Sequence, residues 1–137
     1  LYEMGRRAHM YRKIGEEFIA DDFAHEQSVV FETGKGLVIF NSCSHGGLVN
    51  IVREVQMALG GQKVYAVVGG FHMMKLSGMD TLAIPEEEVV ETAQELKGLG
   101  VEEIYTGHCT GNIAFGILKK ELGEMVHALG TGETVIF

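Results

Sequence analysis

The chain has 137 residues, of which 46% are hydrophobic and 22% charged, a composition that fits one packed domain or part of one and excludes a disordered chain. Its formal net charge of −8 argues against nonspecific binding to nucleic acid, because the phosphate backbone requires a face rich in lysine and arginine. No apolar run approaches the roughly 20 residues of a membrane span, and the amino end lacks a secretory pattern. We therefore expect a cytoplasmic protein without a membrane partner.

The first twenty residues form a poorly defined lead-in. Gly5 and Gly15 interrupt any helix between Tyr2 and Phe18, which predicts a short helix or an irregular connection. The basic residues of this segment are Arg6, Arg7, Arg12 and Lys13. They fit either a solvated helix face or a contact with a substrate phosphate. Because the chain starts at Leu1 and its opening reads as a continuation, we expect a piece of a longer protein.

The rest of the chain alternates predicted strands and helices. A hairpin around Gly34-Lys35-Gly36 joins the first two strands, and apolar residues at helical spacing or a proline start mark each helix. The predicted strands are Ser28–Thr33, Leu37–Phe40, Lys63–Val68, Val101–Tyr105, and two short ones within Val126–Leu129 and Thr134–Phe137. The predicted helices are Leu48–Leu59, Pro85–Gly98 and Ile113–Leu122. The methionine-rich segment Met73–Ile84 is predicted to be a loop. This alternation predicts an α/β fold.

Three histidines follow predicted buried strands in glycine-rich turns, namely His45, His72 and His108, and both cysteines, Cys43 and Cys109, lie in the same turns. The carboxyl ends of strands in an α/β sheet open onto one crevice, so these side chains should converge within roughly 10 Å, the scale of shared metal coordination. Imidazole and thiolate are preferred ligands of zinc and similar divalent metals. The pattern predicts a metal-dependent active site.

The individual roles remain open at this level. His72 fits either a metal ligand or a proton donor, and Cys43 fits either a thiolate ligand or a small buried residue. Cys109 is expected to pack, because in an extended turn it points to the side opposite His108. His9 and His127 lie away from strand exits and are expected to be structural. The acidic segment 21–27, which includes His25, fits either oxygen and imidazole ligands or a solvated loop.

Other reaction classes lack their motifs. The sequence contains no P-loop, no Gly-x-Gly-x-x-Gly dinucleotide fingerprint and no Gly-x-Ser-x-Gly nucleophile elbow.

Four motifs in order resemble one family. They are His25-Glu26-Gln27-Ser28-Val29-Val30; Gly36-Leu37-Val38-Ile39 running to Cys43-Ser44-His45-Gly46-Gly47-Leu48-Val49-Asn50; Ala66-Val67-Val68-Gly69-Gly70-Phe71-His72; and His108-Cys109-Thr110-Gly111. They look like the carboxyl-terminal half of metallo-β-lactamase-fold hydrolases of the dihydropterin-ribofuranosylaminobenzene phosphate synthase-like group. The resemblance implies an αββα sandwich, with residues 1–137 forming a single partial domain, and a site for two metal ions, usually zinc, with iron or manganese possible.

The resemblance also implies roles for particular residues. His108 resembles the last metal-ligand histidine of the superfamily. The turn from Cys43 to His45 falls where the superfamily has the ligand shared by the two metals, commonly an aspartate, so either residue fits that role. His72 is implied to lie near the metal-bound water and the substrate, as a ligand or as a general acid.

One motif of the superfamily is absent. The His-x-His-x-Asp-His cluster, which supplies most ligands of the first metal, occurs nowhere in this chain. We therefore expect the chain alone to bind metal weakly, and expect its missing amino-terminal half to come from the same gene product or another chain. The implied function is hydrolysis of a small phosphoester, ester or pterin-related substrate by metal-activated hydroxide. The alternative is a non-catalytic ligand-binding or regulatory α/β domain, and homo-oligomers are possible.

Overall fold

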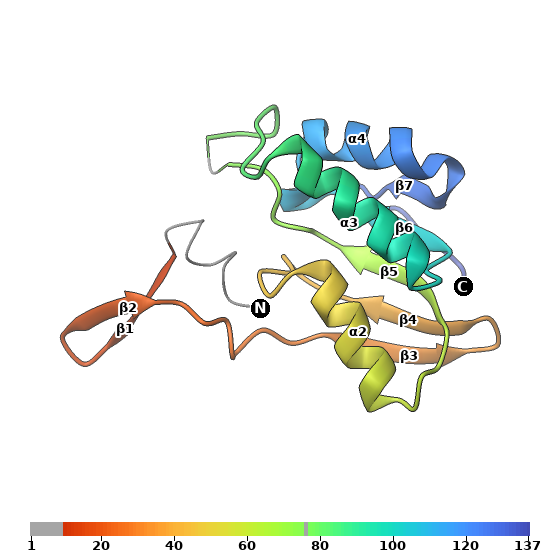
Figure 1. Cartoon of the computed structure of the whole chain (residues 1–137), viewed down its shortest axis with the longest axis horizontal. Coiled ribbons are helices and arrows are strands. Elements are labelled where there is room, and N and C mark those ends of the chain that lie inside the picture. Colours follow the sequence, from red (N-terminus) through yellow and green to blue (C-terminus); the bar gives the residue numbers. More distant parts are fainter. Residues whose placement is uncertain (1–9, 76) are drawn as a thin grey trace.

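The computed structural model describes residues 10–75 and 77–137 and centres on a mixed five-stranded sheet (Figure 1). Its strands, in their order across the sheet, are β3 (Val29–Thr33), β4 (Gly36–Phe40), β5 (Val64–Gly69), β6 (Glu103–Thr106) and β7 (Val126–Ala128). β3 runs antiparallel to β4, and β4, β5, β6 and β7 run parallel to one another. The predicted α/β class is confirmed, and the carboxyl ends of β4, β5 and β6 share one edge.

Three helices cover one face of this sheet (Figure 1). They are α2 (Leu48–Ala58), α3 (Glu86–Gly98) and α4 (Asn112–Leu122), each within a few residues of its predicted range. The core between sheet and helices is built from fully buried aliphatic side chains such as Leu37, Ile39, Val67, Ile104 and Leu118. Burial of each such side chain contributes about 1.5–3 kcal/mol. No helix of the described part of the chain is long and apolar enough to cross a bilayer.

The opposite face of the sheet is apolar, and no helix of residues 10–75 and 77–137 lies over it. Val38, Ala66 and Val68 form its buried centre, flanked by partly buried aromatic side chains. Towards the β3 edge the face is open, since Val29 and Phe31 are 55% and 56% exposed. These two side chains lie on this face because they pair directly with Phe40 and Val38 across the β3–β4 ladder. One face of the sheet is therefore buried beneath helices, whereas the other face is partly exposed.

The short helix or irregular connection predicted between Tyr2 and Phe18 is wrong for the residues of this segment that the structure describes. Tyr11–Ile14 and Glu17–Ala20 form the antiparallel strands β1 and β2, a hairpin that projects from the body of the molecule (Figure 1). Gly15, at φ +61°, makes the turn between them instead of breaking a helix. Arg12 and Lys13 lie on strand β1 and not on a helix face. The Arg12 side chain pairs with Asp22 at 2.8 Å. Arg6, Arg7 and His9 lie outside the described residues.

The last predicted strand is also wrong. Thr134–Phe137 forms no ladder, although Val126–Leu129 does supply β7. A local turn closes the segment, in which the Gly130 N–H donates to the Glu133 carboxylate at 2.6 Å. The Phe137 ring then packs edge-on against Tyr105, with centroids 5.5 Å apart. Aromatic packing on the open sheet face replaces the backbone pairing that the apolar pattern suggested.

The open face predicts self-association of the 137-residue chain, because exposed apolar patches drive contact between molecules. Replacing Phe31 by serine should shift the chain towards monomer in sedimentation velocity. Met57→Ser is the matched control, since Met57 is 75% exposed on α2, over the opposite face, and its loss should change nothing. A wild-type chain that sediments as a single monomeric species at high concentration would contradict the prediction.

Candidate metal site at the strand exits

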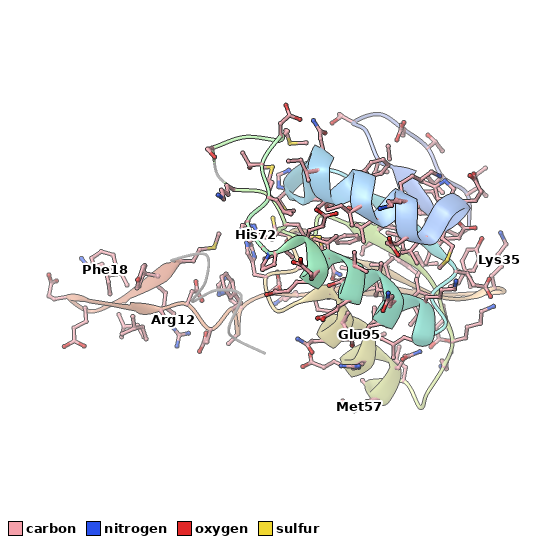
Figure 2. All side chains as sticks on the ribbon, turned by 45° about the horizontal axis from the view of Figure 1, so that its top comes forward. Arg12, Phe18, Lys35, Met57, His72 and Glu95 are labelled. Atoms are coloured by element: carbon pink, nitrogen blue, oxygen red, sulfur yellow. The ribbon has the colours of Figure 1, made fainter. Side chains whose placement is uncertain are left out.

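The three predicted turns converge at the carboxyl edge of the sheet. The rings of His45 and His72 lie with centroids 4.4 Å apart, although 27 residues of sequence separate them. The His72 N–H donates to Cys109 Sγ at 3.2 Å, and ligand atoms of Cys109, Cys43 and His108 all lie within 4.8 Å of one another. Figure 2 shows His72 at the end of the domain that faces the β1–β2 hairpin, with Lys35 at the far end. Parallel pairing of β4, β5 and β6 thus brings together side chains from three remote segments.

Two glycines make this convergence possible. A Cβ on Gly69, where φ is +147°, would overlap the carbonyl oxygen of Asn41. A Cβ on Gly70 would stand 2.6 Å from Cys109 Sγ and 2.9 Å from the Ser42 carbonyl oxygen. The exit of β5 therefore lies between the exits of β4 and β6 at distances that admit no side chain. The Gly70 N–H donates to the Ser42 carbonyl at 2.8 Å, which holds the β4 and β5 exits together.

Buried hydroxyls complete the framework. Ser44 Oγ donates to the Gly70 carbonyl at 2.8 Å, and Thr106 Oγ1 donates to the Gly69 carbonyl at 2.8 Å. Thr110 accepts the Phe71 N–H at 3.0 Å and lies 2.6 Å from Thr106 Oγ1. All three hydroxyl residues are 1% exposed or less. A buried polar network of this kind rigidifies its surroundings when every member is satisfied.

Four residues at this edge have backbones in the left-handed region, which non-glycine residues rarely adopt. They are Phe23, Ser44, His72 and His108, with φ between 47° and 56°. Such conformations cost of order 1–3 kcal/mol each and cluster at functional sites. In the described part of the chain no other non-glycine residue has positive φ, so the strained backbone is confined to the predicted site.

Glu26 fixes the turn that carries His45. Its carboxylate accepts the N–H groups of His45 at 2.7 Å and Gly46 at 2.8 Å, and Oε1 lies 3.2 Å from His45 Nδ1. A ring stack with Phe23, at 4.5 Å between centroids and 7° between planes, supports the other side of His45. Glu26 orients the imidazole and turns its Nε2 away from the carboxylate. The sequence placed Glu26 in an acidic segment without assigning it this role.

His72 is held neutral. Burial lowers its pKa below the ordinary histidine value, and the neighbouring His45 and His108 imidazoles lower it further, while Glu26 opposes the shift. A neutral imidazole at pH 7 offers one nitrogen lone pair, which suits a metal ligand or a proton acceptor.

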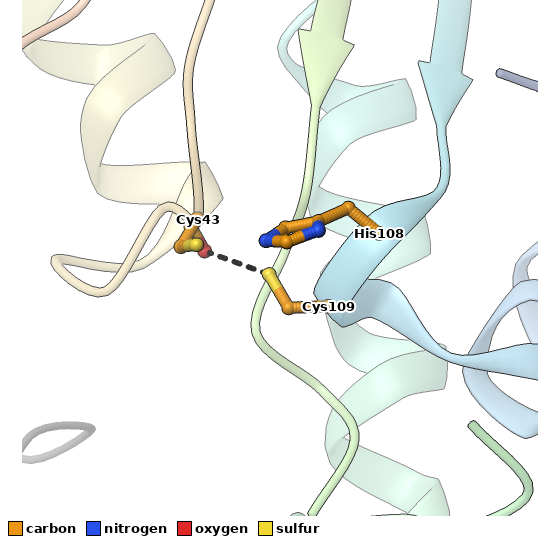
Figure 3. A group of neighbouring side chains, drawn as sticks. All are labelled: Cys43, His108 and Cys109. Carbon is orange, nitrogen blue, oxygen red and sulfur yellow. Dashed lines mark hydrogen bonds between the residues drawn. The ribbon is translucent and has the colours of Figure 1, made fainter. Parts of the chain in front are cut away.

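Cys43, His108 and Cys109 form a compact group of metal-ligand type (Figure 3). Cys43 comes from the turn after β4, whereas His108 and Cys109 come from the turn after β6, and the His108 ring points across the β5 exit towards Cys43 (Figure 3). The expectation that Cys109 points away from His108 fails because that turn is not extended. Residues His108–Thr110 form a 3-10 turn, which swings the thiol to the same side. Burial raises the pKa of Cys109 to about 12.

A hollow of about 290 Å³ opens beside this group. Its lining includes Asn41, Ser42, Gly69, Gly70 and His108, so the imidazole faces open space. The segment Met73–Ile84 was predicted to be a loop, and its described residues contain neither helix nor strand. The backbone N–H groups of Met73 and Met74 donate to the Cys109 carbonyl and so connect this loop to the group.

The remaining histidines lie elsewhere. The His25 side chain is 69% exposed and faces Asp21 at 3.8 Å, so the segment 21–27 contributes Glu26 to the site and not its imidazole. His127 bonds to Glu103 at 2.6 Å and stacks on Tyr105 over the open face of the sheet, outside the candidate metal site.

Comparison with known proteins agrees with this architecture. Over 128 residues, 93% of its length, the chain is 35% identical to 7,8-dihydropterin-6-methyl-4-(beta-D-ribofuranosyl)-aminobenzene-5'-phosphate synthase of Methanocaldococcus jannaschii. Its fold superposes with a TM-score of 0.81 and 29% identity on the crystal structure of a metal-dependent hydrolase of the β-lactamase superfamily, again over 93% of the chain. The chain thus resembles the metallo-β-lactamase superfamily in sequence and in fold. No family model matches it.

The match to these relatives is partial. The chain spans 41% of the synthase and 46% of the hydrolase chain. A five-stranded sheet with helices on one face and an open apolar face on the other corresponds to one half of an αββα sandwich. The metallo-β-lactamase fold expected from the motifs is thereby confirmed.

The close approach at Gly70 predicts that Gly70→Ala destabilises the chain by about 1–3 kcal/mol, because the new methyl group meets a backbone carbonyl that cannot move freely. Gly98→Ala is the control, since a Cβ there meets nothing within 4 Å at the end of α3. Urea unfolding measures both, and equal midpoints for the two variants would contradict the packing argument.

The carboxylate of Glu26 predicts a second stability effect. Glu26→Ala removes two charge-assisted bonds to partly buried N–H groups and should lower the free energy of unfolding by about 2–4 kcal/mol. Glu54→Ala removes an equal charge from the exposed surface of α2 and should cost less than about 0.5 kcal/mol. If both variants unfold alike, Glu26 does not hold the His45 turn.

Proposed function

We propose that this chain forms the metal-binding carboxyl-terminal half of a metal-dependent hydrolase. The observation that carries the proposal is the meeting of imidazole and thiol side chains from three parallel strand exits around one hollow. The proposed ligands of this chain are His45, His108 and Cys43, and the proposed metals are two divalent ions, zinc in the first place, with iron or manganese as alternatives.

The residues present fit a metal on structural grounds. The donors are soft or borderline ligands, the cradle beside Cys109 and His108 admits no Cβ at Gly70, and His108 is exposed to a hollow that can admit water and substrate. A bound divalent ion would supply a nucleophile at neutral pH and stabilise developing negative charge. Free thiols at Cys43 and Cys109 suit a reducing compartment, for which the cytoplasm is our proposal.

His72 is proposed as the catalytic residue of this half. Its ring lies against that of His45, and its lowered pKa keeps the imidazole neutral and able to accept a proton near pH 7. From this position it would transfer a proton to or from the substrate. The left-handed backbone of His72 and the hydrogen bond from its backbone N–H to Cys109 Sγ fix the position from which the side chain leaves the main chain.

The proposed substrate is a small phosphoester, ester or pterin-related molecule, and the relative from Methanocaldococcus jannaschii supports the pterin-related class by its name. The remaining ligands are proposed to come from an amino-terminal half that packs on the open face of the sheet. That face offers Val29, Phe31 and the cluster around Val68, an apolar surface suited to a second sheet.

Removing single side chains in the complete protein tests the assignment. His108→Ala and His45→Ala should each lose activity together with at least one of the two metal ions, whereas His72→Ala should lower turnover about 100-fold or more and retain most of the metal. Metal content by elemental analysis and turnover of a generic phosphodiester or ester are measured on the same preparations. His127→Ala, at an imidazole outside the site, is the control for folding and should match wild type.

Three results would overturn the proposal or parts of it. If His108→Ala retains full metal and turnover, the ligand assignment is wrong. If His72→Ala loses metal as completely as His108→Ala, His72 is a ligand and not the proton-transfer group. A complete protein that holds no metal equivalent would favour the non-catalytic ligand-binding alternative.

A further inference from the structure

We infer that Cys109 is a third ligand from this chain, so that Cys43, His108 and Cys109 form a Cys2His site that holds one soft divalent ion without the remainder of the protein. The inference deepens the proposed function, on which it rests for the presence of a metal at this edge. It reverses the expectation that this chain alone binds metal weakly.

The distances favour a single ion. Tetrahedral zinc with Zn–S near 2.3 Å and Zn–N near 2.0–2.1 Å places its ligand atoms about 3.5–3.8 Å apart. The sulfur and nitrogen atoms of the group already lie within 4.8 Å of one another. The ligand atoms therefore lie close to the spacing that one tetrahedral ion requires.

The surroundings of Cys109 fit a bound thiolate. The His72 N–H donates to its sulfur at 3.2 Å, a bond that stabilises negative charge on sulfur. The thiol itself faces the Cys43 carbonyl oxygen at 3.9 Å, a weak contact that a metal would replace. On the remaining side Gly70 leaves room for sulfur and nothing larger. Cys109 is 5% exposed, so its thiol is directed into the group and not into solvent.

The three ligands are anchored on rigid parts of the fold. Cys43 precedes Ser44, whose hydroxyl is bonded to the β5 exit, and Thr110, next to Cys109, is bonded to Phe71 and contacts Thr106. His108 completes the set from the exposed side, towards the hollow. Three protein ligands with the fourth position towards open space are typical of a catalytic zinc site, whereas a purely structural site is closed by four.

This arrangement divides the histidines into two groups. His108 belongs with the two thiols, whereas His45 and His72 face each other beside Glu26. A second ion at that pair would need ligands from elsewhere, because two imidazoles fall short of the three protein ligands of a catalytic site. Among the described residues, the Cys2His group is thus the one with three candidate ligands from this chain.

Cobalt titration of the reduced 137-residue chain tests the inference, because cobalt replaces zinc and thiolate-to-cobalt charge transfer is visible in the near ultraviolet. We expect one equivalent of Co²⁺ to bind with these bands, to release about two protons, and to be displaced by Zn²⁺. Cys43→Ser, Cys109→Ser and His108→Ala should each weaken binding about 100-fold or more, exceeding the roughly 10–100-fold cost of losing a hydrogen-bond partner of a ligand.

The controls separate this inference from the proposed function. His45→Ala should keep the thiolate bands, and His127→Ala should match wild type; circular dichroism before titration identifies any variant that fails to fold. Co²⁺ bound without thiolate bands, and lost in His45→Ala, would overturn the Cys2His site while leaving a histidine-based hydrolase intact. Thiolate bands of unchanged intensity and unchanged Co²⁺ affinity in Cys109→Ser would remove Cys109 from the ligand set. Thiolate-to-cobalt bands in the 137-residue chain, together with no hydrolysis by the complete protein, would support the Cys2His site and refute the proposed hydrolase function.

Discussion

The close approach of three strand exits at Gly69 and Gly70 is the constraint on which the rest of this structure depends. The exit of β5 passes between the turns after β4 and β6 with no space for a Cβ at either glycine, and the ligand-type atoms of Cys43, His108 and Cys109 lie within 4.8 Å of one another. The site is therefore a product of backbone packing first and of side-chain chemistry second.

The framework at this edge is built from the chain's own polar groups. The buried hydroxyls of Ser44, Thr106 and Thr110, and the carboxylate of Glu26, satisfy backbone groups that turns would otherwise leave unpaired inside the protein. These bonds offset the cost of the left-handed backbone at His72 and His108. A preorganised site of this kind spends little free energy on ordering when a metal or a substrate binds.

The two faces of the sheet are covered differently. Parallel strands require crossovers, and the crossovers α2, α3 and α4 lie on one face, where they bury the aliphatic core. The other face carries Phe31, Phe40 and Val68, and within the described part of the chain the closing segment with Phe137 packs against it. A sheet that is apolar on both sides is typical of a sandwich, in which the second layer is another sheet. The partial coverage of both relatives agrees with one layer of such a sandwich.

The sequence by itself determined the secondary structure from Val29 to Ala128 and the location of His45, His72 and His108, because strand periodicity, glycine turns and parallel connectivity are local signals. It failed at Gly15, which reads as a helix breaker but makes a hairpin, and at Thr134–Phe137, whose apolar pattern serves ring packing on the sheet. Only the tertiary structure decided the roles of Glu26 and Cys109. Glu26 lies 19 residues from the turn it holds, and the side to which Cys109 points depends on a 3-10 turn packed against Gly70 and the loop at Met73. Both depend on contacts between segments remote in the chain, which no local pattern encodes.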